Sequence, residues 1–175
     1  MKGLIHIYTG GGKGKTTAAI GLGIRAYGRG FKVLMVQFMK GMMTGEIKTL
    51  QMLEQGFVLK RGTEIKKFTW QMSAEELDEL SKAEQKMFED TISEVSESEY
   101  QMLILDEIIN SVSCGLIPSQ KVLDFLKNKP EELEVVLTGR NAPKELLDAA
   151  DYVTEMKEVK HPFNKGIPAR KGIES

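Results

Sequence analysis

Short apolar runs alternate with segments of helical periodicity along most of this chain. Runs of strand length lie at residues 4–8, 32–38, 57–60, 100–106, 134–138 and 152–156. Helices are expected between them, at residues 17–27 and 44–55, over a long segment from residue 73, and in shorter segments near Ile108, Pro118 and Pro143. Strands that alternate with crossover helices are typical of a parallel sheet. The pattern therefore predicts an α/β fold, a mostly parallel sheet with helices on both faces.

The start of the longest helix is marked by a capping box at residues 73–76. In this motif the Ser73 hydroxyl and the Glu76 carboxylate each bond to the other residue's backbone amide. The apolar face predicted for the helix carries Leu77, Leu80, Met87, Ile92 and Val95. We interpret its many acidic residues as a solvated outer face.

Length and composition are those of an ordinary globular protein. Hydrophobic residues make up 41% of the 175 residues and charged residues 28%. We find no repeat, no low-complexity tract and no linker, so we predict one domain over residues 1–175. The residues from about 160 to 175 are rich in Gly, Pro and Lys, and we expect an irregular tail there.

Charge and cysteine content exclude several classes of protein. A net charge of −1 argues against a nucleic-acid binder dominated by phosphate attraction. The single cysteine, Cys114, cannot form an internal disulfide and gives no zinc-site spacing, so we expect it to be a small buried residue. No apolar run has the length of a membrane span, and Lys2 and Gly3 lead directly into a strand. These features predict a cytoplasmic protein with no membrane partner.

The most informative motif is the glycine-rich segment between the first strand and the first helix. Residues 14–16, Gly-Lys-Thr, complete the phosphate-loop (P-loop) pattern G-x-x-x-x-G-K-[ST], although Thr9 stands where the pattern has glycine. Backbone amides of such a loop turn toward phosphate oxygens, and the following helix directs its partial positive charge to the same place. The predicted nucleotide-binding residues are Thr9, Gly10, Gly11, Gly12, Lys13, Gly14, Lys15, Thr16 and Thr17.

A pair of acids follows the most apolar run, at the carboxyl end of residues 100–106. In a P-loop protein Asp106 and Glu107 stand where carboxylates hold Mg²⁺, directly or through water. With the Thr16 hydroxyl they form the predicted metal site. The sequence does not say which acid contacts the ion, and two exposed acids at a strand end are the alternative.

Four further side chains are candidates with two interpretations each. Arg140 follows the run at 134–138, where its planar guanidinium suits a phosphate or a structural acid equally. Arg25 either folds toward the nucleotide or lies on the surface. Phe68 and Trp70 project to one side if the segment is extended, and they either join the core or cover a flat apolar ligand. The chain offers no clear Ser-His-Asp or Cys-His arrangement.

Taken together, these segments resemble the ATP:corrinoid adenosyltransferases of the CobA/CobO/BtuR class. The resemblance rests on TGGGKGKTTAAIGLGIRAYGRG (9–30), VQFMKG (36–41), FTW (68–70), LDEI (105–108), EVVLTGRNAP (134–143) and VTEMKEVKHPFNKGIPARKGIE (153–174). The family also carries threonine at the position of Thr9, so the departure from the P-loop pattern becomes part of the match.

The resemblance implies a RecA-like P-loop fold in a homodimer, with Mg²⁺ or Mn²⁺ as cofactor. It implies transfer of the 5′-deoxyadenosyl group of ATP to Co(I) of a corrinoid (cobalamin, cobinamide or cobyrinic acid a,c-diamide), with release of triphosphate. An electron donor such as a reduced flavoprotein would generate Co(I).

The resemblance also assigns roles to individual residues. Lys15, Thr16 and Glu107 would serve the departing triphosphate, while Phe68 and Trp70 would occupy the lower face of the corrin. Arg25 and Arg140 are expected on the nucleotide side. The rival hypotheses are a P-loop kinase, a RecA-like ATPase and a corrinoid carrier that consumes no ATP.

Overall fold

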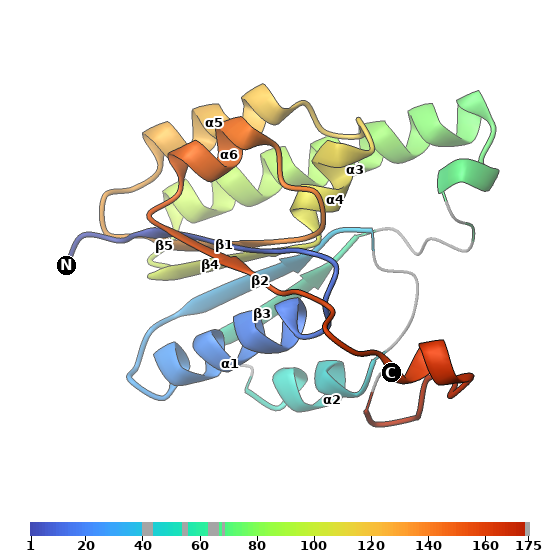
Figure 1. Ribbon diagram of the computed structural model, residues 1–175. Helices are drawn as coiled ribbons and strands as arrows, with labels where there is room; N and C mark the ends of the chain where they lie inside the picture. The colour runs from blue at the N-terminus through green and yellow to red at the C-terminus, as the bar shows by residue number, and fades with distance from the viewer. Residues whose placement is uncertain (40–43, 54–55, 63–66, 68, 174–175) are drawn as a thin grey trace.

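The computed structural model covers the chain and describes residues 1–39, 44–53, 56–62, 67 and 69–173 (Figure 1). Within these residues six strands form one sheet in the order β3-β2-β4-β5-β1-β6. The strands are β1 Ile5–Thr9, β2 Val33–Gln37, β3 Phe57–Arg61, β4 Met102–Asp106, β5 Glu134–Thr138 and β6 Tyr152–Glu155. Every pairing is parallel. The predicted α/β fold is therefore confirmed, and it is consistent with a RecA-like P-loop fold.

Helices cover both faces of this sheet (Figure 1). One face carries α1 Lys15–Tyr27 and α2 Gly45–Gln51, and the other carries α3 Ala74–Glu97, α4 Ile108–Ser113, α5 Ser119–Asn128 and α6 Lys144–Ala149. Alternate residues of β4 enter the two cores, because Leu103 and Leu105 join the α3 side whereas Ile104 joins the α1 side. A central strand covered on both faces needs apolar residues throughout, which explains the unbroken run at 102–105.

Helix α3 begins at the predicted capping box. The Glu76 amide donates to Ser73 Oγ at 3.2 Å, and the Ser73 amide donates to Glu76 Oε2 at 2.9 Å. The buried face of the helix is Leu80, Glu84, Phe88, Thr91 and Val95. Leu80 and Val95 are confirmed as buried, and Met87 and Ile92 are partly buried and pack against the same core. The interpretation of the acidic residues as solvated is wrong for Glu84, which is only 1% exposed.

Two other expectations concern the surface. Cys114 is exposed, not buried, because α4 ends at Ser113 and the chain turns away through Gly115 at φ 73°. The tail contains one short 3-10 helix, Pro162–Lys165, and is otherwise irregular to residue 173, as expected. Among the described residues, no helix combines the length and apolar character that a membrane crossing requires.

Candidate active site

The P-loop connects β1 to α1, and the side chain of its lysine, Lys15, forms hydrogen bonds with the loop backbone. Gly10 and Gly14 take positive φ angles of 99° and 114°, which glycine adopts without a Cβ clash. The buried Lys15 ammonium donates to the carbonyls of Gly10 at 2.7 Å and Gly12 at 2.8 Å. Burial first and the positive charge of Arg140 second lower the pKa of Lys15. The negative charge of an anion in the loop would oppose this lowering, because it stabilises the ammonium form.

Met156, the residue after β6, supports this loop through contacts that the sequence did not reveal. The Gly12 amide donates to the Met156 carbonyl at 2.7 Å, and the Met156 amide donates to the Thr9 carbonyl at 2.8 Å. A Cβ on Gly12 would lie 2.7 Å from the Met156 oxygen. Glycine is therefore required here because a neighbouring backbone approaches the loop.

Asp106 lies at the centre of a hydrogen-bond network at the carboxyl edge of the sheet. Its Oδ1 accepts hydrogen bonds from Thr16 Oγ1 at 2.9 Å and Thr138 Oγ1 at 2.7 Å. Its Oδ2 accepts one from Gln37 Nε2 at 3.2 Å. The carboxylate is fully buried, and the structure thus brings the predicted metal ligands Thr16 and Asp106 into contact.

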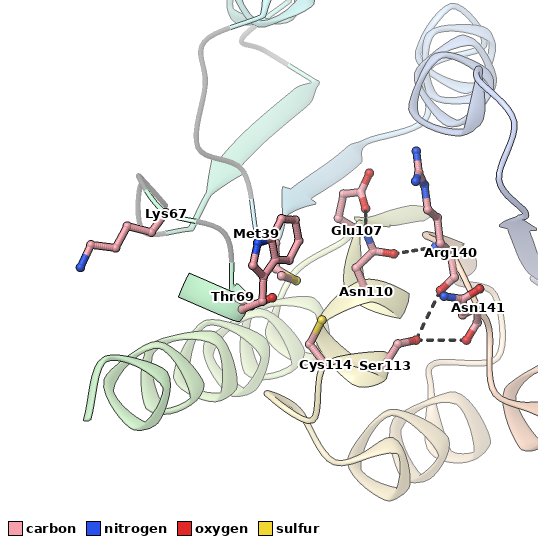
Figure 2. Close-up of a pocket in the computed structure, with 10 residues that line it drawn as sticks. Met39, Lys67, Thr69, Glu107, Asn110, Ser113, Cys114, Arg140 and Asn141 are labelled. Atoms are coloured by element: carbon pink, nitrogen blue, oxygen red, sulfur yellow. Dashed lines mark hydrogen bonds between the residues drawn. The ribbon is translucent and has the colours of Figure 1, made fainter. Parts of the chain in front are cut away.

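Glu107 takes a different position from its neighbour. It adopts a left-handed conformation with φ 64°, and its amide donates to Thr138 Oγ1 at 2.9 Å. Asn110 Nδ2 donates to the Glu107 carboxylate, and Asn110 Oδ1 accepts from the Arg140 amide at 2.6 Å (Figure 2). No role was predicted from the sequence for Asn110 or Thr138, although each is a polar residue next to a buried apolar segment.

A cavity of about 520 Å³ opens beside Glu107 (Figure 2). Its lining includes Met39, Trp70, Glu107, Asn110, Cys114 and Arg140. Trp70 lies in the 3-10 helix Thr69–Gln71 and is 76% exposed. The alternative that places Trp70 in the core is therefore wrong, and so is an extended conformation at this residue. Phe68, its predicted companion, lies outside the described residues.

The two arginines differ in their placement. Arg140 is exposed, and its positive charge lies close enough to Lys15 to lower the pKa of that lysine. Arg25 is exposed in the last turn of α1, about 15 Å along the helix axis from Lys15 at a rise of about 1.5 Å per residue. The structure therefore brings Arg140 to the site and leaves Arg25 away from the P-loop; a role for either residue in nucleotide binding stays a prediction.

The oxygen atoms near the P-loop suit Mg²⁺. Within the described ranges, no three side chains of the His, Cys, Asp and Glu types cluster as a metal site. Mg²⁺ usually takes only one or two carboxylates and completes its shell with water and substrate phosphates, as the Thr16 and Asp106 oxygens would allow. The buried Gln37 Oε1 has no hydrogen-bond partner and lies in the residue that contacts Asp106. This unpaired oxygen fits a hydrated cation next to the carboxylate.

Comparison with known proteins extends these observations to the whole chain. A family model described as ATP:corrinoid adenosyltransferase BtuR/CobO/CobP matches residues 1–175. A corrinoid adenosyltransferase of Sinorhizobium sp is 41% identical over 175 residues, which cover 99% of this chain and 80% of that protein. The corrinoid adenosyltransferase of Escherichia coli (strain K12) is 36% identical, and CobA of Salmonella typhimurium is 35% identical, each with 99% of this chain and 86% of the relative covered. The chain belongs to the ATP:corrinoid adenosyltransferase family.

Proposed function

We propose that this protein transfers the 5′-deoxyadenosyl group of ATP to Co(I) of a corrinoid and releases triphosphate. The observation that carries the proposal is the position of the cavity. Glu107 and the exposed Trp70 both line the cavity. Glu107 directly follows Asp106, which is hydrogen-bonded to Thr16 of the P-loop. A nucleotide loop and a cavity that presents an exposed indole thus share one acidic edge of the sheet. A kinase for a small polar acceptor has no need of an exposed tryptophan there.

The P-loop would act on the leaving group. In this reaction the C5′–O bond breaks, its electron pair stays on the triphosphate, and the Co(I) electron pair forms the cobalt–carbon bond. Lys15, the loop amides and the uncapped start of α1 at Gly14 would bind the growing negative charge. Thr16 and Asp106 would hold Mg²⁺ or Mn²⁺, which supplies further charge neutralisation on the triphosphate when bound.

The cavity would receive the corrinoid. The Trp70 indole offers a flat apolar surface suited to the face of a macrocycle. Phe68 is its expected partner on the lower face of the corrin, where two aromatic side chains would exclude an axial ligand from cobalt. Co(II) without that ligand is easier to reduce to Co(I). The nucleophile then comes from the substrate, so the protein needs no catalytic triad.

The proposal extends to partners. Because Co(I) must be generated by reduction, we infer an external electron donor such as a reduced flavoprotein. We also infer a homodimer and a cytoplasmic location, where ATP and reductant are both supplied. A direct comparison of cobalamin, cobinamide and cobyrinic acid a,c-diamide as substrates would identify the preferred corrinoid.

Product analysis tests the proposal. The protein is incubated with ATP, Mg²⁺ and chemically reduced cob(I)alamin, and the reaction is followed by optical spectra and by separation of phosphate products. We expect a cobalt–carbon bond and one triphosphate per adenosyl group. ADP alone would indicate a kinase, ADP with phosphate an ATPase, and an unchanged nucleotide a carrier. Any of these three results would refute the transferase assignment, and Lys15→Ala serves as the inactive control.

A further inference from the structure

One buried carboxyl has no role in the proposed mechanism. Glu84 lies on the inward face of α3 and is 1% exposed. Its Oε2 accepts a hydrogen bond from Ser111 Oγ at 2.6 Å, and its Oε1 accepts one from the Met39 amide at 3.2 Å. Burial raises the pKa of Glu84, and these two hydrogen bonds only partly offset the effect. Burying a carboxyl with two neutral partners is costly, so stability alone does not explain this residue.

One partner of Glu84 lines the cavity, and the other lies in a helix whose neighbouring residues line it. Met39 follows β2, lines the cavity (Figure 2) and adopts a left-handed conformation with φ 48°. This conformation costs a non-glycine residue free energy, and it persists only where neighbouring groups hold it. Ser111 lies on α4, directly after Asn110 and one turn beyond Glu107, and both of these residues line the cavity.

A third segment passes over the same carboxyl. A Cβ on Gly62 would lie 3.3 Å from Glu84 Oε1 and 2.9 Å from the Met87 methyl. Gly62 follows β3, on the path of the chain toward Trp70. Glu84 is therefore packed beneath the end of β2, the end of β3 and α4, although it does not line the cavity itself.

We propose that Glu84 is a positioning residue for the corrinoid half of the active site. Its carboxyl fixes the Met39 backbone relative to α4, and this sets the width of the cavity between Met39 and the Glu107–Asn110 turn. The inference rests on the proposed function for the identity of the acceptor. The nucleotide half is held by other contacts, namely those of Lys15 and Asp106, so Glu84 serves the acceptor and not ATP.

Two substitutions at Glu84 separate positioning from stability. Glu84→Gln keeps an acceptor for the Met39 amide and gives Ser111 a donor, whereas Glu84→Met fills a similar volume without either bond. Glu84→Met removes a costly buried carboxyl but leaves the Met39 amide and the Ser111 hydroxyl without their acceptor, and each unsatisfied donor lowers stability. Urea unfolding measures the net change in stability, and the KM values are compared under conditions in which both proteins are folded. We expect the KM for corrinoid to rise roughly tenfold, the effect of losing a hydrogen bond to a charged group.

The KM for ATP should change little in Glu84→Met, and Glu84→Gln should restore the KM for corrinoid close to the wild-type value. Glu79→Met is the matched control, since Glu79 is an exposed acid on the same helix. Ser111→Ala removes one of the two contacts and should raise the same KM by a smaller factor. This variant keeps the test valid even if Glu84→Met does not fold.

Trp70 is the single tryptophan and provides a readout that needs no turnover. Its fluorescence is titrated with cob(II)alamin in the presence of MgATP. We expect quenching in wild type and a weaker apparent affinity in Glu84→Met. Quenching with the same affinity in wild type, Glu84→Met and Ser111→Ala would refute the positioning role. No quenching in wild type would instead refute the acceptor assignment, so the two failures are distinct.

Discussion

The hydroxyl of Thr138 links the two acids at the carboxyl end of β4, Asp106 and Glu107, so its removal tests the site directly. It donates to Asp106 Oδ1 at 2.7 Å and accepts from the Glu107 amide at 2.9 Å, in a fully buried position. Thr138→Val keeps the shape but removes both bonds. A hydrogen bond to a charged group contributes about 1.5–3 kcal/mol, and an unsatisfied buried amide costs about 1–3 kcal/mol. Because one hydroxyl makes both bonds, we expect a combined loss of about 2–4 kcal/mol in the free energy of unfolding.

Thr138→Ser is the matched control because it keeps the hydroxyl and removes one methyl group. Loss of a single buried methyl costs about 0.5–1.5 kcal/mol. The hydrogen-bond argument therefore predicts that the Val variant is less stable than the Ser variant in urea unfolding, whereas an argument from packing alone predicts the reverse. The Val variant should also need more Mg²⁺ for adenosyl transfer. A Val variant at least as stable as Ser, with a wild-type Mg²⁺ titration, would refute the reasoning.

Four further predictions follow. Lys15→Ala should weaken MgATP binding by about 1.5–3 kcal/mol in calorimetry without loss of fold by circular dichroism, because one charge-assisted phosphate contact is lost. Of Asp106→Asn and Glu107→Gln, at least one should raise the Mg²⁺ requirement steeply; titrations identical to wild type for both would contradict the metal site. Trp70→Ala should react slowly from Co(II) with a mild reductant, recover with pre-reduced Co(I), and lose the four-coordinate Co(II) signal expected for wild type in electron paramagnetic resonance. Since burial raises the pKa of Glu84 from its ordinary 4.5, the folded state holds this proton more tightly than the unfolded chain. Urea unfolding should therefore show wild type losing stability relative to Glu84→Gln as pH rises from 4.5 through the raised pKa, and a constant difference would contradict this.

The strands and the P-loop were predictable because their signals are local. Parallel strands covered on both faces need continuous apolar runs, and the runs at 4–8, 32–38, 100–106 and 134–138 coincide with β1, β2, β4 and β5 to within one or two residues. The capping box at Ser73 is likewise a local motif. Each of these features is encoded in fewer than ten consecutive residues.

The contacts that build the site depend instead on the order of the strands. Gln37 and Thr138 both bond to Asp106 because β2 and β5 flank β4 in the sheet. The Met156 carbonyl reaches Gly12 because β6 pairs with β1. Apolar runs predict that these strands exist but not which strand lies next to which, so the sequence alone could not reveal these contacts.

Glu84 is a different case, because a local signal was present. It lies four residues after Leu80 and four before Phe88, and residues at this spacing share one face of a helix. The same spacing that placed Leu80 in the core therefore placed Glu84 there too. Its acidic side chain favoured an exposed position, but its spacing from Leu80 and Phe88 along the helix decided that it is buried.

The backbone conformations around the cavity give independent support for its importance. Within the described part of the chain, the non-glycine residues with positive φ are Met39, Glu107 and Asn141, and all three line this one cavity. A left-handed conformation costs a non-glycine residue about 1–2 kcal/mol, and such residues concentrate at functional sites.

Each of these three backbones is also held by a neighbouring side chain. Glu84 accepts from the Met39 amide, Thr138 accepts from the Glu107 amide, and Ser113 Oγ donates to the Asn141 carbonyl at 3.0 Å. The side chains come from α3, β5 and α4, so three separate elements oppose the relaxation of three unfavourable turns. Random strain would be scattered over the surface and would lack such support. The concentration of supported strain at one cavity argues that its shape is maintained for a ligand, and the proposed function makes the acceptor of the adenosyl group the candidate for that ligand.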